Sequence, residues 1–101
     1  MSEIVLTKIG DIPSGTGKQF ILEGLVIALF NVDGKFFAID DTCTHAEASL
    51  SEGSLEGTVV TCPHHGAQFD LKSGNALTLP AVTGVRTYPI KIQGDEIKIV
   101  L

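Results

Sequence analysis

The stretch LVIALFNVDGKFFAI, residues 25–39, decides the fold class. It holds two apolar runs, Leu25–Phe30 and Phe36–Ile39, which are joined by a short segment containing Asp33-Gly34. Asp-Gly between two apolar runs is a strong signal for a β-hairpin, because both residue types tolerate the positive φ angles of a tight turn. The stretch therefore predicts two antiparallel strands.

Short apolar runs separated by turn residues continue through most of the chain. Further strands are expected at Ile4–Ile9, Phe20–Leu22, Thr58–Thr61, Gln68–Leu71, Val85–Ile92 and Glu96–Leu101. The last two should pair across the turn Gln93-Gly94-Asp95. Since no segment sustains a helical period over three turns, we predict an all-β fold. It should be a small antiparallel β-sandwich or barrel of roughly eight to ten short strands.

Length and composition indicate one compact domain that spans residues 1–101. The net charge of −5 and the scattered basic residues argue against nucleic-acid binding. The longest uncharged apolar stretch lies between Glu23 and Asp33, well short of the ~20 residues that cross a bilayer, and the N-terminus lacks a signal-peptide pattern. We therefore expect a soluble, cytoplasmic monomer with no membrane association.

All the cysteines and histidines of the chain lie within residues 43–65. They form two short motifs, Cys43-Thr44-His45 and Cys62-Pro63-His64-His65, with residues 46–61 between them. The first motif falls in a segment, residues 40–57, that is expected to be a long loop, and long loops in compact domains are usually functional. Two cysteines in a reducing compartment are more often metal ligands or catalytic groups than a disulfide.

Three kinds of site combine thiolates with imidazoles. A structural zinc site usually pairs Cys with Cys and His with His, so a mixed arm such as Cys43-Thr44-His45 is atypical of it. A catalytic cysteine needs one base, an orienting group and an oxyanion site, and two mixed pairs exceed that need. In a two-iron, two-sulfur cluster, two thiolates can hold one iron while two imidazoles hold the other. Mixed arms that close from opposite sides suit this third arrangement.

The two motifs resemble those of Rieske-type ferredoxins, in particular the soluble ferredoxin components of bacterial ring-hydroxylating dioxygenases. That family carries Cys-x-His, a spacer of similar length, and then Cys-Pro-x-His-Gly, which Cys62-Pro63-His64-His65-Gly66 matches. The resemblance also covers Leu50–Gly53, Phe69-Asp70, Gly74, Leu79–Ala81 and Tyr88–Ile90.

The resemblance implies a Rieske-type fold that holds one 2Fe-2S cluster between two loops, at about residues 40–57 and 62–67. It assigns four ligands, Cys43, His45, Cys62 and His65, and leaves His64, at the variable position, as a bystander. It implies an electron carrier rather than an enzyme, which takes electrons from a flavin-containing reductase and passes them to a terminal Rieske oxygenase in aromatic hydrocarbon catabolism. The alternatives are the small subunit of a nitrite-reductase-like or other redox complex, and a structural zinc module that acts as an interaction domain.

Further expectations concern the surroundings of the cluster. High-potential family members carry an additional Cys in each loop and a Ser and a Tyr that donate to the cluster sulfurs, whereas this chain has Ala67 and Phe69. We therefore predict a reduction potential near the low end of the Rieske range, ~−150 mV. Pro80 either lies in a loop that shields the cluster, as the resemblance suggests, or is an ordinary turn proline. The acidic residues in or beside the first loop are expected to form a solvated edge, or alternatively to face a basic reductase; these are Asp40, Asp41, Glu47 and Glu52.

Overall fold

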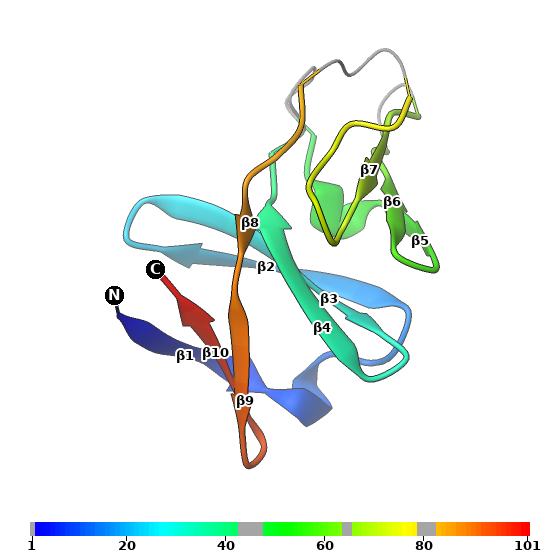
Figure 1. Ribbon diagram of the computed structural model, residues 1–101. Helices are drawn as coiled ribbons and strands as arrows, with labels where there is room; N and C mark the ends of the chain where they lie inside the picture. The colour runs from blue at the N-terminus through cyan, green and yellow to red at the C-terminus, as the bar shows by residue number, and fades with distance from the viewer. Residues whose placement is uncertain (1, 43–47, 64–65, 79–82) are drawn as a thin grey trace.

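The computed structural model describes residues 2–42, 48–63, 66–78 and 83–101 (Figure 1). Within these residues the elements are β1 (Glu3–Lys8), η1 (Ile9–Asp11), β2 (Thr16–Leu22), β3 (Leu25–Val32), β4 (Lys35–Asp40), η2 (Leu50–Glu52), β5 (Ser54–Glu56), β6 (Val59–Thr61), β7 (Gln68–Asp70), β8 (Thr87–Tyr88), β9 (Ile90–Gln93) and β10 (Glu96–Val100). The strands dominate and the two helical elements are single 3-10 turns, so the all-β prediction is confirmed.

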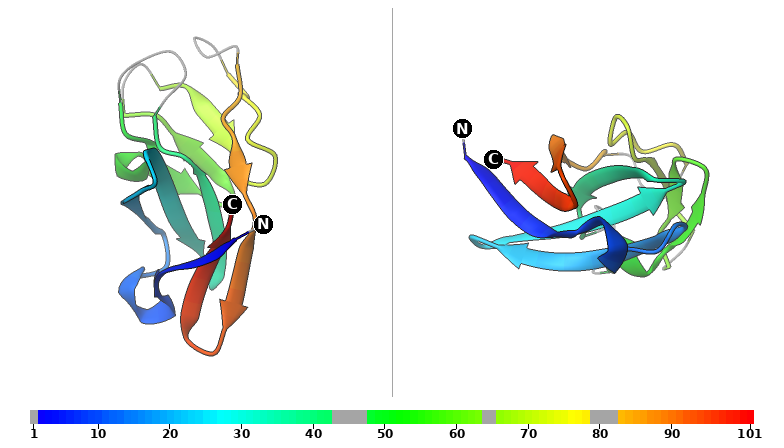
Figure 2. Two further views of the ribbon diagram at one scale, coloured as in Figure 1. Left: turned by 90° about the vertical axis from the view of Figure 1, so that its left-hand side faces the viewer. Right: turned by 90° about the horizontal axis from the view of Figure 1, so that it is seen from below.

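The strands form three antiparallel sheets. Their orders are β1-β10-β9, β2-β3-β4-β8 and β5-β6-β7. The four-stranded sheet lies between the other two in the views of Figures 1 and 2. The two ends of the chain lie side by side, because the backbones of Ser2 and Leu101 exchange hydrogen bonds of 3.1 and 2.9 Å.

Tight turns connect the central strands, and the turn between β3 and β4 is the one that the sequence predicts. β3 and β4 pair from Val32↔Lys35 onward, which leaves Asp33 and Gly34 as a two-residue turn with φ angles of 51° and 88°. β2 and β3 are joined in the same way by Glu23 and Gly24. Positive φ at both turn residues matches the right-handed twist of the flanking strands, so each turn fixes the register of its hairpin.

Three segments differ from the sequence prediction. The strand expected over Phe20–Leu22 begins earlier, at Thr16. The strand expected over Val85–Ile92 is interrupted at Pro89: β8 pairs with β4, whereas β9 pairs with β10 in a different sheet. Proline has no N–H for a ladder, so it suits the residue at which the chain changes sheets. The segment 40–57, expected to be a loop, contains η2 and β5 in its second half.

Two hydrophobic core clusters share strand β3. Ala28 and Phe30 belong to a cluster with the β5–β7 sheet, whereas Ile27 and Leu29 belong to a second cluster with β10. Successive residues of a strand face opposite sides of the sheet, and both faces of β3 are covered by a core cluster. All four side chains are therefore fully buried. β3 thereby couples the β5–β7 sheet to the rest of the fold.

Candidate metal centre

Most of the predicted ligands lie outside the described residues. These ligands are Cys43, His45 and His65. Three further residues named in the sequence analysis, His64, Glu47 and Pro80, also lie outside the described residues. Cys62 is the predicted ligand that the structure describes. The site is therefore built from Cys62 and from the residues at which each ligand-bearing segment begins and ends.

The second arm, residues 62–67, is closed at its base. Thr61 of β6 pairs with Gln68 of β7, and the backbone N–H of Cys62 donates to the carbonyl of Ala67 at 2.7 Å. Gly66 has a φ of +74°, in the left-handed region that favours glycine. The chain thus leaves the sheet at Cys62 and returns to it at Ala67, with the Cys-Pro-His-His motif inside a short hairpin connection.

The first arm, residues 42–49, is closed in a similar way. Thr42 and Ser49 form an antiparallel bridge, and the backbone N–H of Leu50 donates to the carbonyl of Asp41 at 2.7 Å. Cys43 and His45 lie in sequence between the two sides of this closure. In each of the two ligand-bearing segments, the residue at which the segment begins is therefore paired with the residue at which it ends.

A single core cluster joins the bases of the two arms. Ala48 from the first arm and Cys62 and Ala67 from the second belong to the cluster that also contains Leu50 and Phe69. Cys62 is only 2% exposed, and Ala67 and Phe69 are completely buried. The two motifs, far apart in sequence, thus emerge from the same buried centre.

This arrangement fits an iron–sulfur cluster. A buried cysteine suits a thiolate ligand that must be shielded from water, and the two arms together contain two cysteines and three histidines, enough for two thiolate and two imidazole ligands. A cluster with this donor set takes up and releases one electron, and two ferric ions, two sulfides and two thiolates sum to no net charge. Neutrality makes electron uptake easier than in a cluster with four thiolates.

The two carboxylates that precede the first arm do not form the solvated edge expected from the sequence. Asp41 is 1% exposed, so the expectation was wrong for this residue. Asp40 is half-buried and accepts a hydrogen bond of 2.6 Å from the hydroxyl of Tyr88. Burial of Tyr88, together with this bond to the Asp40 carboxylate, raises the pKa of Tyr88 to about 12. Glu52 is exposed, as expected.

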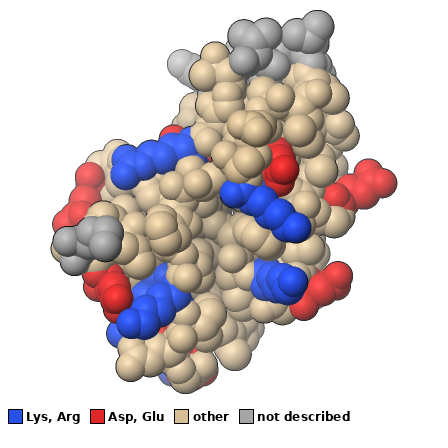
Figure 3. All heavy atoms as spheres, viewed as in Figure 1, with Lys and Arg blue, Asp and Glu red and all other residues tan. Residues whose placement is uncertain are grey.

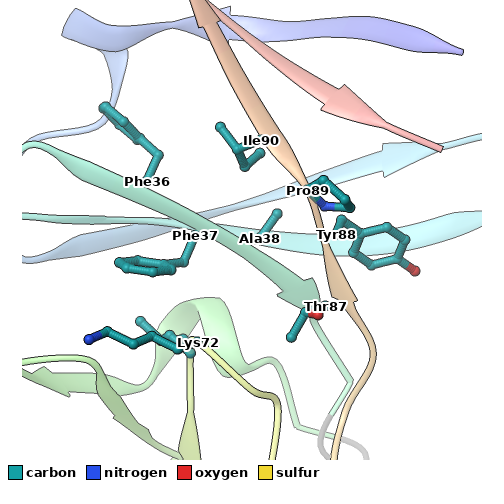
Figure 4. Close-up of a pocket in the computed structure, with 9 residues that line it drawn as sticks. Phe36, Phe37, Ala38, Lys72, Thr87, Tyr88, Pro89 and Ile90 are labelled. Atoms are coloured by element: carbon teal, nitrogen blue, oxygen red, sulfur yellow. The ribbon is translucent and has the colours of Figure 1, made fainter.

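A surface groove of about 410 Å³ lies where β8 and β9 diverge from β4 (Figure 4). Its lining is mainly apolar and aromatic, and includes Phe36, Phe37 and Pro89. Neither Cys nor His is among the described residues that line it, so it does not compete with the two arms as a metal site. On the same face of the molecule, basic and acidic side chains are interspersed (Figure 3).

An all-β fold that presents two Cys–His arms from one buried centre defines a Rieske-type iron–sulfur protein. Residues 2–89 match the family model of the Rieske [2Fe-2S] domain, and the chain belongs to this family.

Similar proteins are ferredoxins of dioxygenase systems. The 3-phenylpropionate/cinnamic acid dioxygenase ferredoxin subunit of Shigella boydii is 47% identical over 98 residues, which cover 96% of this chain and 92% of that protein. The ferredoxin of carbazole 1,9a-dioxygenase from Nocardioides aromaticivorans superposes with a TM-score of 0.93 at 27% identity, covering 98% and 97% of the two chains. A chain in a complex of reduced oxygenase and oxidized ferredoxin in carbazole 1,9a-dioxygenase gives a TM-score of 0.90 at 31% identity, covering 96% and 91%.

The chain is accordingly a Rieske ferredoxin: it carries electrons on one 2Fe-2S cluster and is not itself an enzyme. The predictions of the fold family, the cofactor and the electron-carrier role are confirmed. In the part of the chain that the structure describes, no helix has the length and apolar character needed to cross a membrane.

Proposed function

We propose that this chain is the ferredoxin component of a ring-hydroxylating dioxygenase system. It would accept one electron at a time from a flavin-containing reductase and deliver it to a terminal Rieske oxygenase. The observation that carries this proposal is the 47% identity, over nearly the whole chain, to a dioxygenase ferredoxin subunit. The similarity to a ferredoxin chain solved in complex with its oxygenase supports the oxygenase as the electron acceptor.

The proposed ligands are Cys43 and Cys62 on one iron and His45 and His65 on the other. The closure of each arm supports one Cys–His pair per arm, because each segment with fixed ends carries one Cys and at least one His. We propose His65 rather than His64 because His65 precedes Gly66, as the ligand does in the family pattern. The whole of residues 1–101 would act as one domain around these two loops.

The partners follow from the chemistry of an electron carrier. Imidazole ligands have outer edges that are free to meet a partner protein, so the His-bound iron is the one from which an electron would leave. Such redox encounters use small, weak interfaces. The monomeric state and the cytoplasmic location expected from the sequence stay predictions. Absorption spectroscopy distinguishes an iron–sulfur protein from the alternative, a structural zinc module, because a zinc protein is colourless.

Reconstitution tests the proposal. The purified protein should be red-brown and reducible, and turnover of an aromatic substrate by a candidate reductase and oxygenase should require it. His65→Ala should abolish both the normal Rieske spectrum and the turnover, because it removes a proposed ligand. His64→Ala is the matched control and should largely retain both.

Two results would contradict the proposal. A colourless protein that holds one zinc ion would exclude an iron–sulfur carrier. Full turnover in the absence of the ferredoxin would show that the oxygenase receives its electrons by another route. A normal spectrum in His65→Ala together with a lost spectrum in His64→Ala would overturn the ligand assignment alone.

A further inference from the structure

Asp41 is a charged side chain in an unusual place. It is 1% exposed, and the other polar residue buried in the described part of the chain is the neutral Asn31. Removing a carboxylate from water is costly unless hydrogen bonds replace its hydration. The hydrogen-bond partners of Asp41 therefore indicate which parts of the structure this buried carboxylate holds together.

Both carboxylate oxygens of Asp41 accept a hydrogen bond. Oδ1 accepts from the backbone N–H of Ser51 at 2.8 Å, and Oδ2 accepts from Nε2 of Gln19 at 2.7 Å. The backbone of Asp41 is also held, since its N–H donates to Val26 at 2.9 Å and its carbonyl accepts from Leu50. Bonds to a charged acceptor are stronger than those between neutral groups.

These bonds cross the base of the first ligand arm. Asp41 lies immediately before the bridge between Thr42 and Ser49, and Ser51 lies just after it. Nε2 of Gln19 also lies 3.4 Å from Oγ of Ser49, so Gln19 contacts both sides of the arm. The carboxylate thus joins the outgoing chain, the returning chain and strand β2.

We propose that Asp41, supported by Gln19, is a positioning residue for the cluster: it fixes the base of the arm that carries Cys43 and His45. This inference rests on the proposed ligand set. Groups that orient metal ligands without touching the metal commonly affect metal retention strongly. The carboxylate of Asp41 is buried, accepts two hydrogen bonds and lies two residues before Cys43, so it is placed to have this effect.

Asp40 provides an internal control. It is the same residue type one position earlier, and strand alternation directs its side chain to the opposite face of β4. Its carboxylate accepts from Tyr88 on β8 rather than from the returning side of the arm. Asp40→Asn removes a charge close to the arm without opening its base, and its amide oxygen can still accept from Tyr88.

The experiment compares Asp41→Ala, Asp41→Asn, Gln19→Ala and Asp40→Asn in the cluster-loaded protein. The readouts are the electron paramagnetic resonance spectrum of the reduced cluster and the rate of cluster loss to an iron chelator. In Asp41→Ala we expect an altered spectrum and about tenfold faster cluster loss, the lower end of typical outer-shell effects. Asp41→Asn can still accept from Ser51 but not from Gln19, so both it and Gln19→Ala should give smaller changes in the same direction. Asp40→Asn should match the wild type.

The outcomes separate this inference from the proposed function. A wild-type Rieske spectrum combined with unchanged spectra and loss rates in the Asp41 and Gln19 variants would overturn the positioning role alone. Equal acceleration in Asp40→Asn would also overturn it, because the effect would then be one of charge or general stability. Gln19 is exposed on β2, so Gln19→Ala keeps the test decisive if Asp41→Ala does not fold. A wild-type protein without a Rieske spectrum would instead contradict the proposed function.

Discussion

Two residues beside Cys62 carry no hydroxyl group. Ala67 and Phe69 are completely buried in the core cluster that contains Cys62, and the carbonyl of Ala67 accepts the N–H of Cys62. A hydroxyl donor near a cluster sulfur stabilises the reduced cluster, which is the more negative form, and therefore raises its potential. The apolar side chains at these positions favour a low potential.

Ala67→Ser should raise the reduction potential. One additional hydrogen bond has a net value of about 0.5–1.5 kcal/mol, which corresponds to about 20–65 mV for a one-electron couple. A redox titration of both proteins measures the shift, and the wild-type value should lie near ~−150 mV. A wild-type midpoint above about +100 mV would contradict the low-potential assignment, which rests on the Rieske range.

Ala76→Ser is the control for this change. Ala76 bridges to Phe69 and packs against the same core cluster, but it lies outside both ligand arms. It should leave the potential unchanged. If Ala67→Ser also leaves it unchanged, the serine hydroxyl does not reach the cluster sulfurs.

At the level of elements, the hairpins could be predicted because their determinants are local. Asp33-Gly34 contains the whole signal for its turn, and both residues adopt the positive φ angles that the dipeptide predicts. The two ligand motifs are equally local, but the choice of four ligands within them comes from the family resemblance and stays a prediction. The closure of each arm is consistent with that choice.

The deviations from prediction have non-local causes. The segment Val85–Ile92 was expected to be one strand, but β4 pairs with its first part and β10 with its second, on either side of Pro89. The short strand β5 exists because β6 pairs with it, and three residues carry little pattern of their own. Asp41 was misjudged for the same reason: its buried environment comes from Gln19 and Ser51, which pattern alone does not bring together.

Strand β8 has only two residues, and the hydroxyl of one of them, Tyr88, donates to Asp40. This contact predicts how the stability of the protein depends on pH. An ordinary tyrosine ionises near pH 10, whereas the pKa of Tyr88 is raised to about 12 in the folded protein. The unfolded chain therefore loses this proton first as the pH rises. The stability that Tyr88 contributes is fully present below pH ~10 and is lost between pH ~10 and ~12, by on the order of 2 kcal/mol.

Tyr88→Phe should be less stable than the wild type at neutral pH, by about 1 kcal/mol for the lost hydrogen bond to Asp40. The gap between the two proteins should close and then change sign as the pH rises above ~10, because only the wild type loses the Tyr88 proton and the ~2 kcal/mol that it loses exceeds the ~1 kcal/mol gap. Chemical denaturation from about pH 8 to about pH 11 measures both effects, over the range in which ordinary tyrosines ionise. A gap that stays constant with pH would show that the hydroxyl is not linked to stability in this way.

At the scale of the whole molecule, only one of the two hydrophobic core clusters contains residues of the ligand arms. This first core cluster, around Cys62, includes Val60 and Phe69 from the β5–β7 sheet together with Ala48 from the first arm. The second core cluster joins the other two sheets through residues such as Ile27 and Ile97, and none of its described members belongs to a ligand arm. With the proposed ligands, the iron–sulfur cluster would thus add cross-links to one half of the fold only.

Removal of the iron should therefore loosen the two halves to different extents. Without the iron–sulfur cluster, the β5–β7 sheet keeps its three short strands and its apolar contacts with β3 and β4, but it loses the cross-links of the ligand arms. Its amides should therefore exchange with solvent faster. Amides of β3 and β10 around Ile27 and Ile97 should keep most of their protection, because the second core cluster is intact. Hydrogen exchange of the chelator-treated and cluster-loaded proteins, read by mass spectrometry or NMR, measures this difference. A uniform loss of protection over both halves would instead show that the iron–sulfur cluster holds the entire fold together.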